Sequence, residues 1–169
     1  MRAIVITAYG PPEALAVAEL PDPVPAAGEV LIRVAAFGLN HAEAYMRSGA
    51  RGEVAQVPGI ECAGTVQDDP SGRLAAGTAV VAILGGMGRT RNGSYAELVT
   101  VPAGNVVPVV TSLSWTDLVA LPEVYATARA AGPGSGAARP TRSRRPRAAP
   151  PGRSTAARCG PGPRCWLAQ

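Results

Sequence analysis

The 169-residue chain contains no lysine, so all 16 of its basic side chains are arginines, and aromatic residues make up only 4%. It has three cysteines, Cys62, Cys159 and Cys165. This odd number does not indicate a disulfide framework, and a reducing compartment is the simpler expectation. No apolar run approaches the roughly 20 residues of a membrane-spanning helix, and the run Ala3–Ala8 is too short for a signal peptide. We therefore expect a cytoplasmic protein without membrane association.

Acidic residues are absent from residues 129–169, although twelve occur earlier in the chain. Residues 1–128 carry seven arginines and a net charge of −5, whereas residues 129–169 carry nine arginines and a net charge of +9. The second segment is rich in Ala, Pro and Gly, and its only large apolar side chains are Trp166 and Leu167. Such a segment buries too little surface to offset the entropy of ordering. The composition predicts a folded domain over residues 1–128 and a disordered tail over residues 129–169.

The first hundred residues alternate short, β-branched apolar runs with Gly, Pro and Asp turn signals. This pattern predicts many short strands without long helices between them, which favours a barrel or sandwich over a parallel α/β sheet. The expected strands are Ala3–Ala8, Leu15–Leu20, Val30–Ala36, Ala63–Gln67, Ala79–Leu84, Tyr95–Pro102 and Val106–Val109.

Short helices fit between and after these strands, so the expected fold class is mainly β with short helices (α+β). Ser114 followed by Asp117 resembles the capping box that begins a helix. Pro122 suits the first turn of another helix. The expected helices are Asn40–Ser48, Ser114 to about Leu121, and Pro122 to about Ala130.

Several motifs follow one another along residues 1–128, namely Gly10–Glu13, Pro21–Pro25, Gly28–Val34, Gly38–Gly49, Pro58–Val66 and Asn92–Glu97. In this order they resemble the medium-chain dehydrogenase/reductase superfamily, specifically its zinc-independent quinone oxidoreductase branch. The resemblance implies a GroES-like, partly open β-barrel catalytic domain followed by a Rossmann domain, with the cofactor between them. The implied cofactor is NADPH, and the implied partner is a small-molecule electron acceptor, a quinone or an α,β-unsaturated carbonyl.

The same resemblance argues against a metal. Zinc alcohol dehydrogenases of the superfamily place a Cys where this sequence has Asn40 and a His where it has Ile60. A catalytic zinc needs about three ligands drawn from Cys, His and carboxylate, and neither an amide nor an aliphatic side chain suits it. Cys62 is expected to be a small buried hydrophobe. We therefore expect no metal site.

Asn40 and Tyr45 are the candidate catalytic residues. The Asn40 amide can donate and accept hydrogen bonds near the nicotinamide and the acceptor. Tyr45, one helical turn further on, could donate to a developing enolate or phenolate oxygen. By the same resemblance, Asn40, His41 and Thr127 are the candidate cofactor-binding residues.

Each candidate also has a structural explanation. Asn40 can simply cap its helix, Tyr45 can be a half-buried packing residue, and His41 can be an ordinary surface or core histidine. Glu61 can be a structural carboxylate with all its hydrogen bonds made, beneath the expected cleft, rather than an acid or base. Arg89 and Arg91 could reach the cleft, but arginines in loops are more commonly solvated.

A nucleotide-binding fingerprint should follow residue 128. Gly132–Gly136 resembles it superficially, but no apolar strand precedes these glycines. Gly85–Gly88 follows a strand but opens no helix, which predicts an irregular loop. We therefore expect a truncated chain, with a frameshift near codon 129, negligible activity alone and no family dimer interface.

Two other functions stay open from the sequence. The tail could bind nucleic acid without sequence preference, by neutralising phosphates with its arginines. Its single aromatic residue makes recognition by base stacking poor. The barrel could instead be a non-catalytic module for a small apolar ligand. The tail arginines in question are Arg142, Arg144, Arg145, Arg147 and Arg153.

Overall fold

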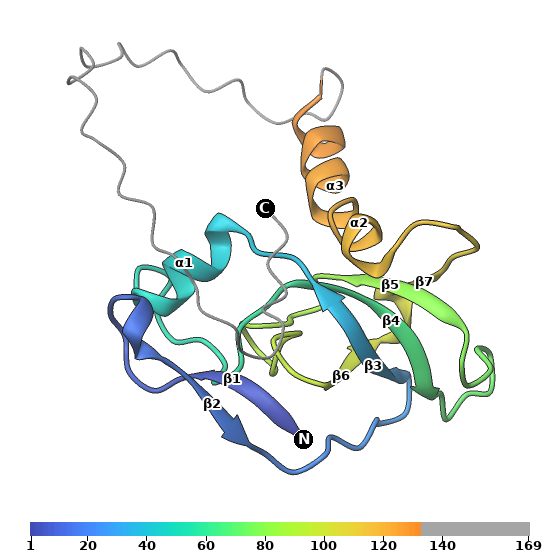
Figure 1. The fold of residues 1–169 in the computed structure, drawn as a ribbon, viewed down its shortest axis with the longest axis horizontal. Coiled ribbons are helices and arrows are strands. Elements are labelled where there is room, and N and C mark those ends of the chain that lie inside the picture. The colour runs from blue at the N-terminus through green and yellow to red at the C-terminus, as the bar shows by residue number, and fades with distance from the viewer. Residues whose placement is uncertain (133–169) are drawn as a thin grey trace, which may run out of the picture.

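The computed structural model describes residues 1–132, and their elements are labelled in Figure 1. This part of the chain is mainly β, with a curled five-stranded sheet, a two-stranded hairpin and short helices, which confirms the expected fold class. The strands are β1 (Arg2–Ile6), β2 (Leu15–Glu19), β3 (Glu29–Phe37), β4 (Glu61–Asp68), β5 (Ala79–Ile83), β6 (Leu98–Pro102) and β7 (Val106–Pro108), and the helices are α1 (His41–Arg47), α2 (Trp115–Val119) and α3 (Pro122–Ala131).

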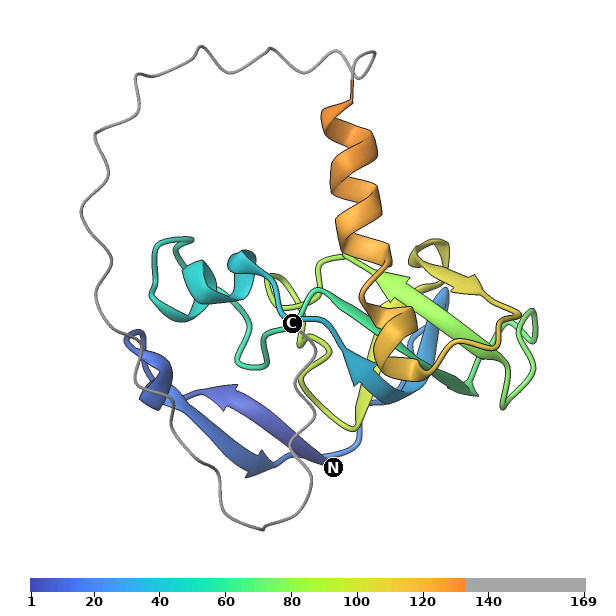
Figure 2. The same cartoon turned by 45° about the horizontal axis from the view of Figure 1, so that its top comes forward.

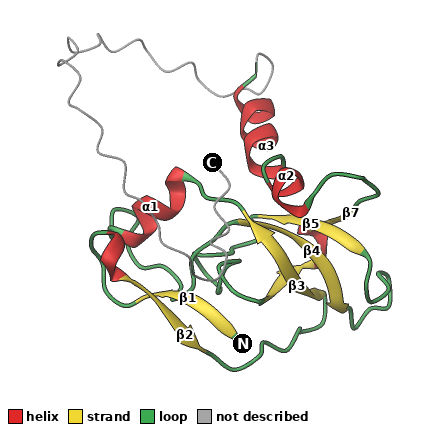
Figure 3. Ribbon diagram, viewed as in Figure 1, coloured by secondary structure: helices red, strands yellow, loops and turns green. Residues whose placement is uncertain are grey.

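The five-stranded sheet has the order β6-β3-β4-β5-β7, and all of its neighbours are antiparallel. The β1–β2 hairpin lies beside this sheet rather than within it (Figure 3). Backbone hydrogen bonds from Ile4 N to Tyr95 O, at 2.7 Å, and from Glu97 N to Arg2 O, at 3.1 Å, attach the hairpin. The result is a partly open barrel.

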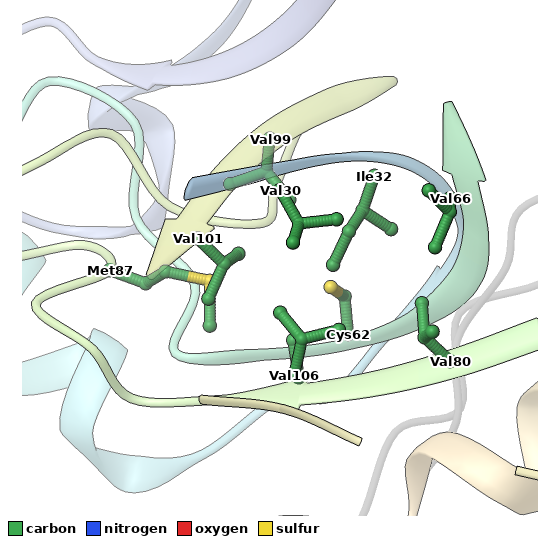
Figure 4. Close-up of a cluster of buried hydrophobic side chains, with 10 residues drawn as sticks. Val30, Ile32, Cys62, Val66, Val80, Met87, Val99, Val101 and Val106 are labelled. Carbon is green, nitrogen blue, oxygen red and sulfur yellow. The ribbon is translucent and has the colours of Figure 1, made fainter. Parts of the chain in front are cut away.

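The main core lies inside the curl of the sheet, where side chains of every strand in the sheet meet (Figure 4). Alternation along β3 sends Val30 and Ile32 inward, and alternation along β4 sends Cys62 and Val66 inward. Val99 and Val101 of β6, Val80 and Ala82 of β5, Val106 of β7 and Met87 complete this cluster.

The opposite face of the sheet is covered by α2. Leu118 and Val119 of this helix pack on Ala36 and Ala63. The middle of β4 is therefore buried on both faces. Gly64 lies where β3 bulges, and a Cβ at Gly64 would fall 2.1 Å from the Arg33 carbonyl oxygen, so only glycine fits the close approach of the two strands.

Helix α3 projects away from the barrel, and none of its side chains is buried in the described part of the chain (Figure 2). It continues to Ala131, so residues 129–131, which composition assigned to the disordered tail, are helical. The rest of the predicted tail, including the glycines at 134 and 136 and the tail arginines, lies outside the described residues. Among residues 1–132, no helix has both the length and the apolar character needed to cross a bilayer.

Candidate active site

Asn40 begins α1, at the point where the chain leaves the sheet. It is the N-cap residue, with extended backbone angles, and it forms a capping box with Glu43. In this box, Glu43 Oε2 accepts a hydrogen bond from the Asn40 backbone N–H at 2.8 Å. Asn40 therefore occupies the N-cap position of α1, as the helix-capping explanation predicted.

The side chain of Asn40 has a second partner, 21 positions along the chain. Its Nδ2 donates a hydrogen bond to Glu61 Oε1 at 2.9 Å. The register of the sheet explains this contact, because Phe37 at the end of β3 pairs with Cys62 at the start of β4. Asn40 follows Phe37 closely and so reaches Glu61. An amide nitrogen carries two hydrogens, so Asn40 has a second N–H besides the one that Glu61 accepts. The Asn40 side chain also lowers the pKa of the nearby Glu43 carboxylate.

Glu61 connects this corner to α3. Its Oε2 accepts a hydrogen bond from the backbone N–H of Glu123, in the first turn of that helix, at 2.8 Å. Glycine at position 38 makes room for the carboxylate, since a Cβ there would fall 2.1 Å from Glu61 Oε1. Glu61 is buried but fully hydrogen-bonded, as the structural explanation of this residue predicted.

Glu43 is a second buried carboxylate in the same corner. Its Oε1 accepts from the Ile60 backbone N–H at 3.1 Å, and its Oε2 accepts from Asn40. Burial raises the pKa of both Glu43 and Glu61 above the usual value, because removal from water disfavours the charged form. The hydrogen bonds that each carboxylate accepts lower its pKa and oppose this effect.

An aromatic pair and a buried hydroxyl pack near Glu61 in the same corner. The rings of Phe37 and Tyr95 stack, with centroids 4.4 Å apart. Ser94 is fully buried, and its hydroxyl donates to the backbone carbonyl of Glu61 at 2.6 Å. Burial raises the pKa of Tyr95, and the nearby Glu43 and Glu61 carboxylates raise it further.

Tyr45 and His41 lie on α1 with their side chains exposed. The Tyr45 ring has the guanidinium of Arg51 over it, 5.9 Å from its centroid. Thr127 is exposed on α3, and its hydroxyl donates to Glu123 Oε1 at 2.9 Å. No side-chain hydrogen bond or ring contact joins these three residues to Asn40, so their roles toward a cofactor or an acceptor stay predictions.

The structure also shows where the remaining candidates lie. Arg91 pairs with Glu29, while Arg89 is exposed. Cys62 lies in the core, where burial raises the pKa of its thiol to about 12, in agreement with its prediction as a small buried hydrophobe. Gly85–Gly88 forms an irregular loop, as expected.

Sequence reasoning missed Glu43, Gly38 and Ser94. A signal for Glu43 was present, because Asn40 followed three residues later by a glutamate is the pattern of a capping box. No local signal marks Gly38 or Ser94, because both act on Glu61, which is distant in the sequence.

An apolar groove lies between the β1–β2 hairpin, the sheet and α2, with a volume of about 700 Å³. Leu39, the residue before Asn40, lines it. Its other apolar walls come from Ile4, Leu15, Val17, Val34 and Phe37.

A curled, partly open antiparallel sheet of this kind is the architecture of a GroES-like domain. Residues 26–111 match the family model of the alcohol dehydrogenase GroES-like domain. Together with the relatives below, this shows that the chain belongs to the medium-chain dehydrogenase/reductase superfamily and is quinone oxidoreductase-like, which confirms the resemblance.

A quinone oxidoreductase from Mus musculus is 32% identical over 134 residues, which are 76% of this chain and 39% of that protein. A solved NAD-dependent alcohol dehydrogenase is similar with a TM-score of 0.70 and 31% identity, over 77% of this chain and 46% of that one. The quinone oxidoreductase of Thermus thermophilus, also solved in complex with NADPH, has a TM-score of 0.60 and 33% identity, over 76% and 39% of the two chains. The chain thus spans less than half the length of these relatives.

Proposed function

We propose that this domain is the acceptor-binding part of an oxidoreductase that transfers hydride from NADPH to a quinone or an α,β-unsaturated carbonyl without zinc. The observation that carries the proposal is the Asn40 amide at the start of α1, whose Nδ2 donates a hydrogen bond to the Glu61 carboxylate. The mouse and Thermus relatives, which are quinone oxidoreductases, support the choice of acceptor.

The donor set at this corner supports zinc-independence. The two positions that carry zinc ligands in zinc alcohol dehydrogenases hold an amide, Asn40, and an aliphatic side chain, Ile60. Within residues 1–132, no group of three or more His, Cys, Asp or Glu side chains could hold a metal ion. The nearby carboxylates of Glu43 and Glu61 already accept hydrogen bonds on both oxygens.

In the proposed reaction, bound NADPH would supply the hydride and be oxidised to NADP⁺, and solvent would supply the proton that completes reduction of the acceptor. The chain orients the acceptor and stabilises the negative charge that develops on its oxygen. The second N–H of the Asn40 amide would donate to this oxygen, which needs less polarisation in a quinone than in a simple ketone. Tyr45 is the proposed second donor, and His41 and Thr127 are the proposed cofactor contacts.

The described residues hold the reacting end of this site but contain no strand, glycine-rich turn and helix for the pyrophosphate. We therefore propose that the 169-residue chain binds NADPH weakly and has negligible activity by itself. NADPH oxidation with a soluble benzoquinone measures this directly. Turnover of about 1–10³ s⁻¹, the usual range of enzymes, would contradict it.

The site itself can be tested without the nucleotide-binding half. Reduced nicotinamide mononucleotide and duroquinone are titrated separately into the ¹⁵N-labelled chain. Signals of Asn40, Tyr45 and Thr127 should shift, and N40A should abolish the duroquinone response, because the amide donor is lost. E13Q is the matched control, since it removes an exposed carboxylate that does not line the apolar groove. Shifts confined to other residues, or zinc bound stoichiometrically and lost in E61Q, would refute the proposal.

A second candidate function is binding of a small apolar ligand without catalysis. The 700 Å³ groove favours it, because its size and apolar walls are typical of ligand pockets. Thermal-shift measurements with quinones, with and without NADPH, separate the two functions. Stabilisation by a quinone that V34D, in the groove, removes and N40A leaves intact would favour simple binding. Nucleic-acid binding through the tail arginines stays a prediction about residues outside the described part.

A further inference from the structure

Glu61 accepts hydrogen bonds from both Asn40 and the first turn of α3. One carboxylate oxygen accepts from the Asn40 amide at 2.9 Å, and the other accepts from the Glu123 backbone N–H at 2.8 Å. These two partners lie 21 and 62 positions away in the sequence. The carboxylate therefore joins α1 and α3 at the corner proposed to hold the acceptor.

We propose that Glu61, in its ionised form, is the positioning residue that sets the orientation of the Asn40 amide and couples it to the start of α3. This inference rests on the proposed function, in which Asn40 is the donor to the acceptor oxygen. Glu61 would not touch the acceptor itself. It would act through Asn40.

The chemistry of the contact explains why a carboxylate is needed. Both donors are N–H groups, so the residue between them must present two acceptor atoms. An ionised carboxylate does so, whereas glutamine offers one acceptor oxygen and one donor nitrogen. Glutamine at position 61 could therefore accept from only one of the two donors, and its amide nitrogen would face the other.

The orientation of the Asn40 amide follows from the same bond. The oxygen and nitrogen ends of an amide are nearly equal in size, and hydrogen bonding decides which end points where. Glu61 accepts only from the nitrogen end and so selects one of the two orientations. The selected orientation keeps the second N–H of Asn40 as a donor.

Two features of the structure hold Glu61 in place. It is the first residue of β4, where alternation sends Cys62 into the core and the Glu61 side chain to the opposite face. Glycine at position 38 leaves the space that the carboxylate occupies. The contact with Glu123 is also important for α3, because this helix has no buried side chain of its own.

The test follows two nuclear magnetic resonance signals in the whole chain, the Asn40 side-chain amide and the Glu123 backbone amide. In E61Q one donor loses its acceptor, so we expect that signal to move toward its free-amide position and, for Glu123, to exchange at least tenfold faster. E13Q is the matched control, because Glu13 is exposed and does not line the groove, and it should move neither signal. If both signals stay in place in a folded E61Q, the proposal is wrong.

A titration of the wild-type chain keeps the proposal testable even if E61Q fails to fold. The Asn40 side-chain amide and the Glu123 amide should titrate with the midpoint of the Glu61 carboxyl carbon. The Asn40 backbone amide should instead follow Glu43, its own acceptor. An Asn40 side-chain signal that follows Glu43, or that does not titrate, would overturn the proposal. A purely structural role of Glu61 would not link these signals selectively.

Neither measurement contains a cofactor or an acceptor. A negative duroquinone titration would therefore refute the proposed function and leave the Glu61 contacts intact. Uncoupled signals would refute the positioning role while the proposed function could still hold.

Discussion

The hydroxyl of Ser94 donates a 2.6 Å hydrogen bond to the backbone carbonyl of Glu61, and Ser94 is fully buried. This contact fixes the loop before β6 under the first residue of β4. The side chain of Glu61 points to Asn40 and Glu123, while its carbonyl is held by Ser94. The candidate site therefore depends on a hydrogen bond that neither Asn40 nor Tyr45 makes.

Replacing Ser94 with alanine should destabilise the domain by about 1–3 kcal/mol, because the Glu61 carbonyl would stay buried without this partner. Urea denaturation, followed by tryptophan fluorescence, measures the change. S71A is the control, since Ser71 is exposed in a surface turn. Equal stabilities of S94A and the wild type would show that the carbonyl finds another donor.

Replacing Gly38 with alanine should cost about 1–3 kcal/mol, as is usual when a packed site is overfilled. The new methyl group would fall 2.1 Å from Glu61 Oε1 and displace the carboxylate. G104A is the matched control, because nothing lies within 4 Å of a Cβ at Gly104. Calorimetric unfolding of both variants checks the prediction, and a G38A variant as stable as G104A would contradict it.

The thiol of Cys62 should resist thiol reagents in the folded domain. Burial raises its pKa to about 12, which lowers the thiolate fraction at pH 8 by about a thousandfold. The measurement uses Ellman's reagent on C159S/C165S, so that Cys62 is the only thiol. Reaction should require denaturant. A fast reaction of one thiol without denaturant would show that the core opens readily.

The stability difference between the wild type and E61Q should depend on pH in a defined direction. The folded pKa of Glu61 is raised, so the folded state takes up this proton more readily than the unfolded state. The wild type should therefore gain stability relative to E61Q as the pH falls from 7 toward the usual glutamate value, and the gain should end there. Urea denaturation at several pH values measures this difference.

E97Q gives the opposite sign and serves as the comparison. Hydrogen bonds from the backbone N–H and side chain of Arg2 lower the pKa of Glu97. The contribution of Glu97 is complete above the usual glutamate pKa and is lost as the pH falls through its lowered folded value. Parallel pH profiles for E61Q and E97Q would contradict the assignment of opposite shifts.

Most of the strands were predictable because their signals are local. Apolar alternation and turn residues locate all seven strands to within a few positions. The Ser114 and Asp117 cap also formed as expected, with the Asp117 backbone N–H donating to the Ser114 hydroxyl at 3.2 Å. Such patterns depend on neighbours in the chain, which the sequence displays directly.

Two strand starts differ from the expected positions by two or more residues, and both differences have tertiary causes. The strand expected from Ala63 begins at Glu61. The prediction started too late because a charged residue gives no sign of burial in the sequence, whereas in the structure Glu61 bonds to Asn40, Ser94 and α3. The strand expected from Tyr95 begins at Leu98. Residues 95–97 instead form hydrogen bonds with β1.

The sequence alone indicated the mainly β fold, because local periodicity and turn residues decide it, and it indicated the family through the resemblance of its motifs. Only the tertiary structure decided that Asn40 both caps α1 and donates to Glu61, that Glu43 is a second buried carboxylate, and that α3 starts on Glu61. These contacts join residues far apart in the chain, so they depend on strand register and close packing.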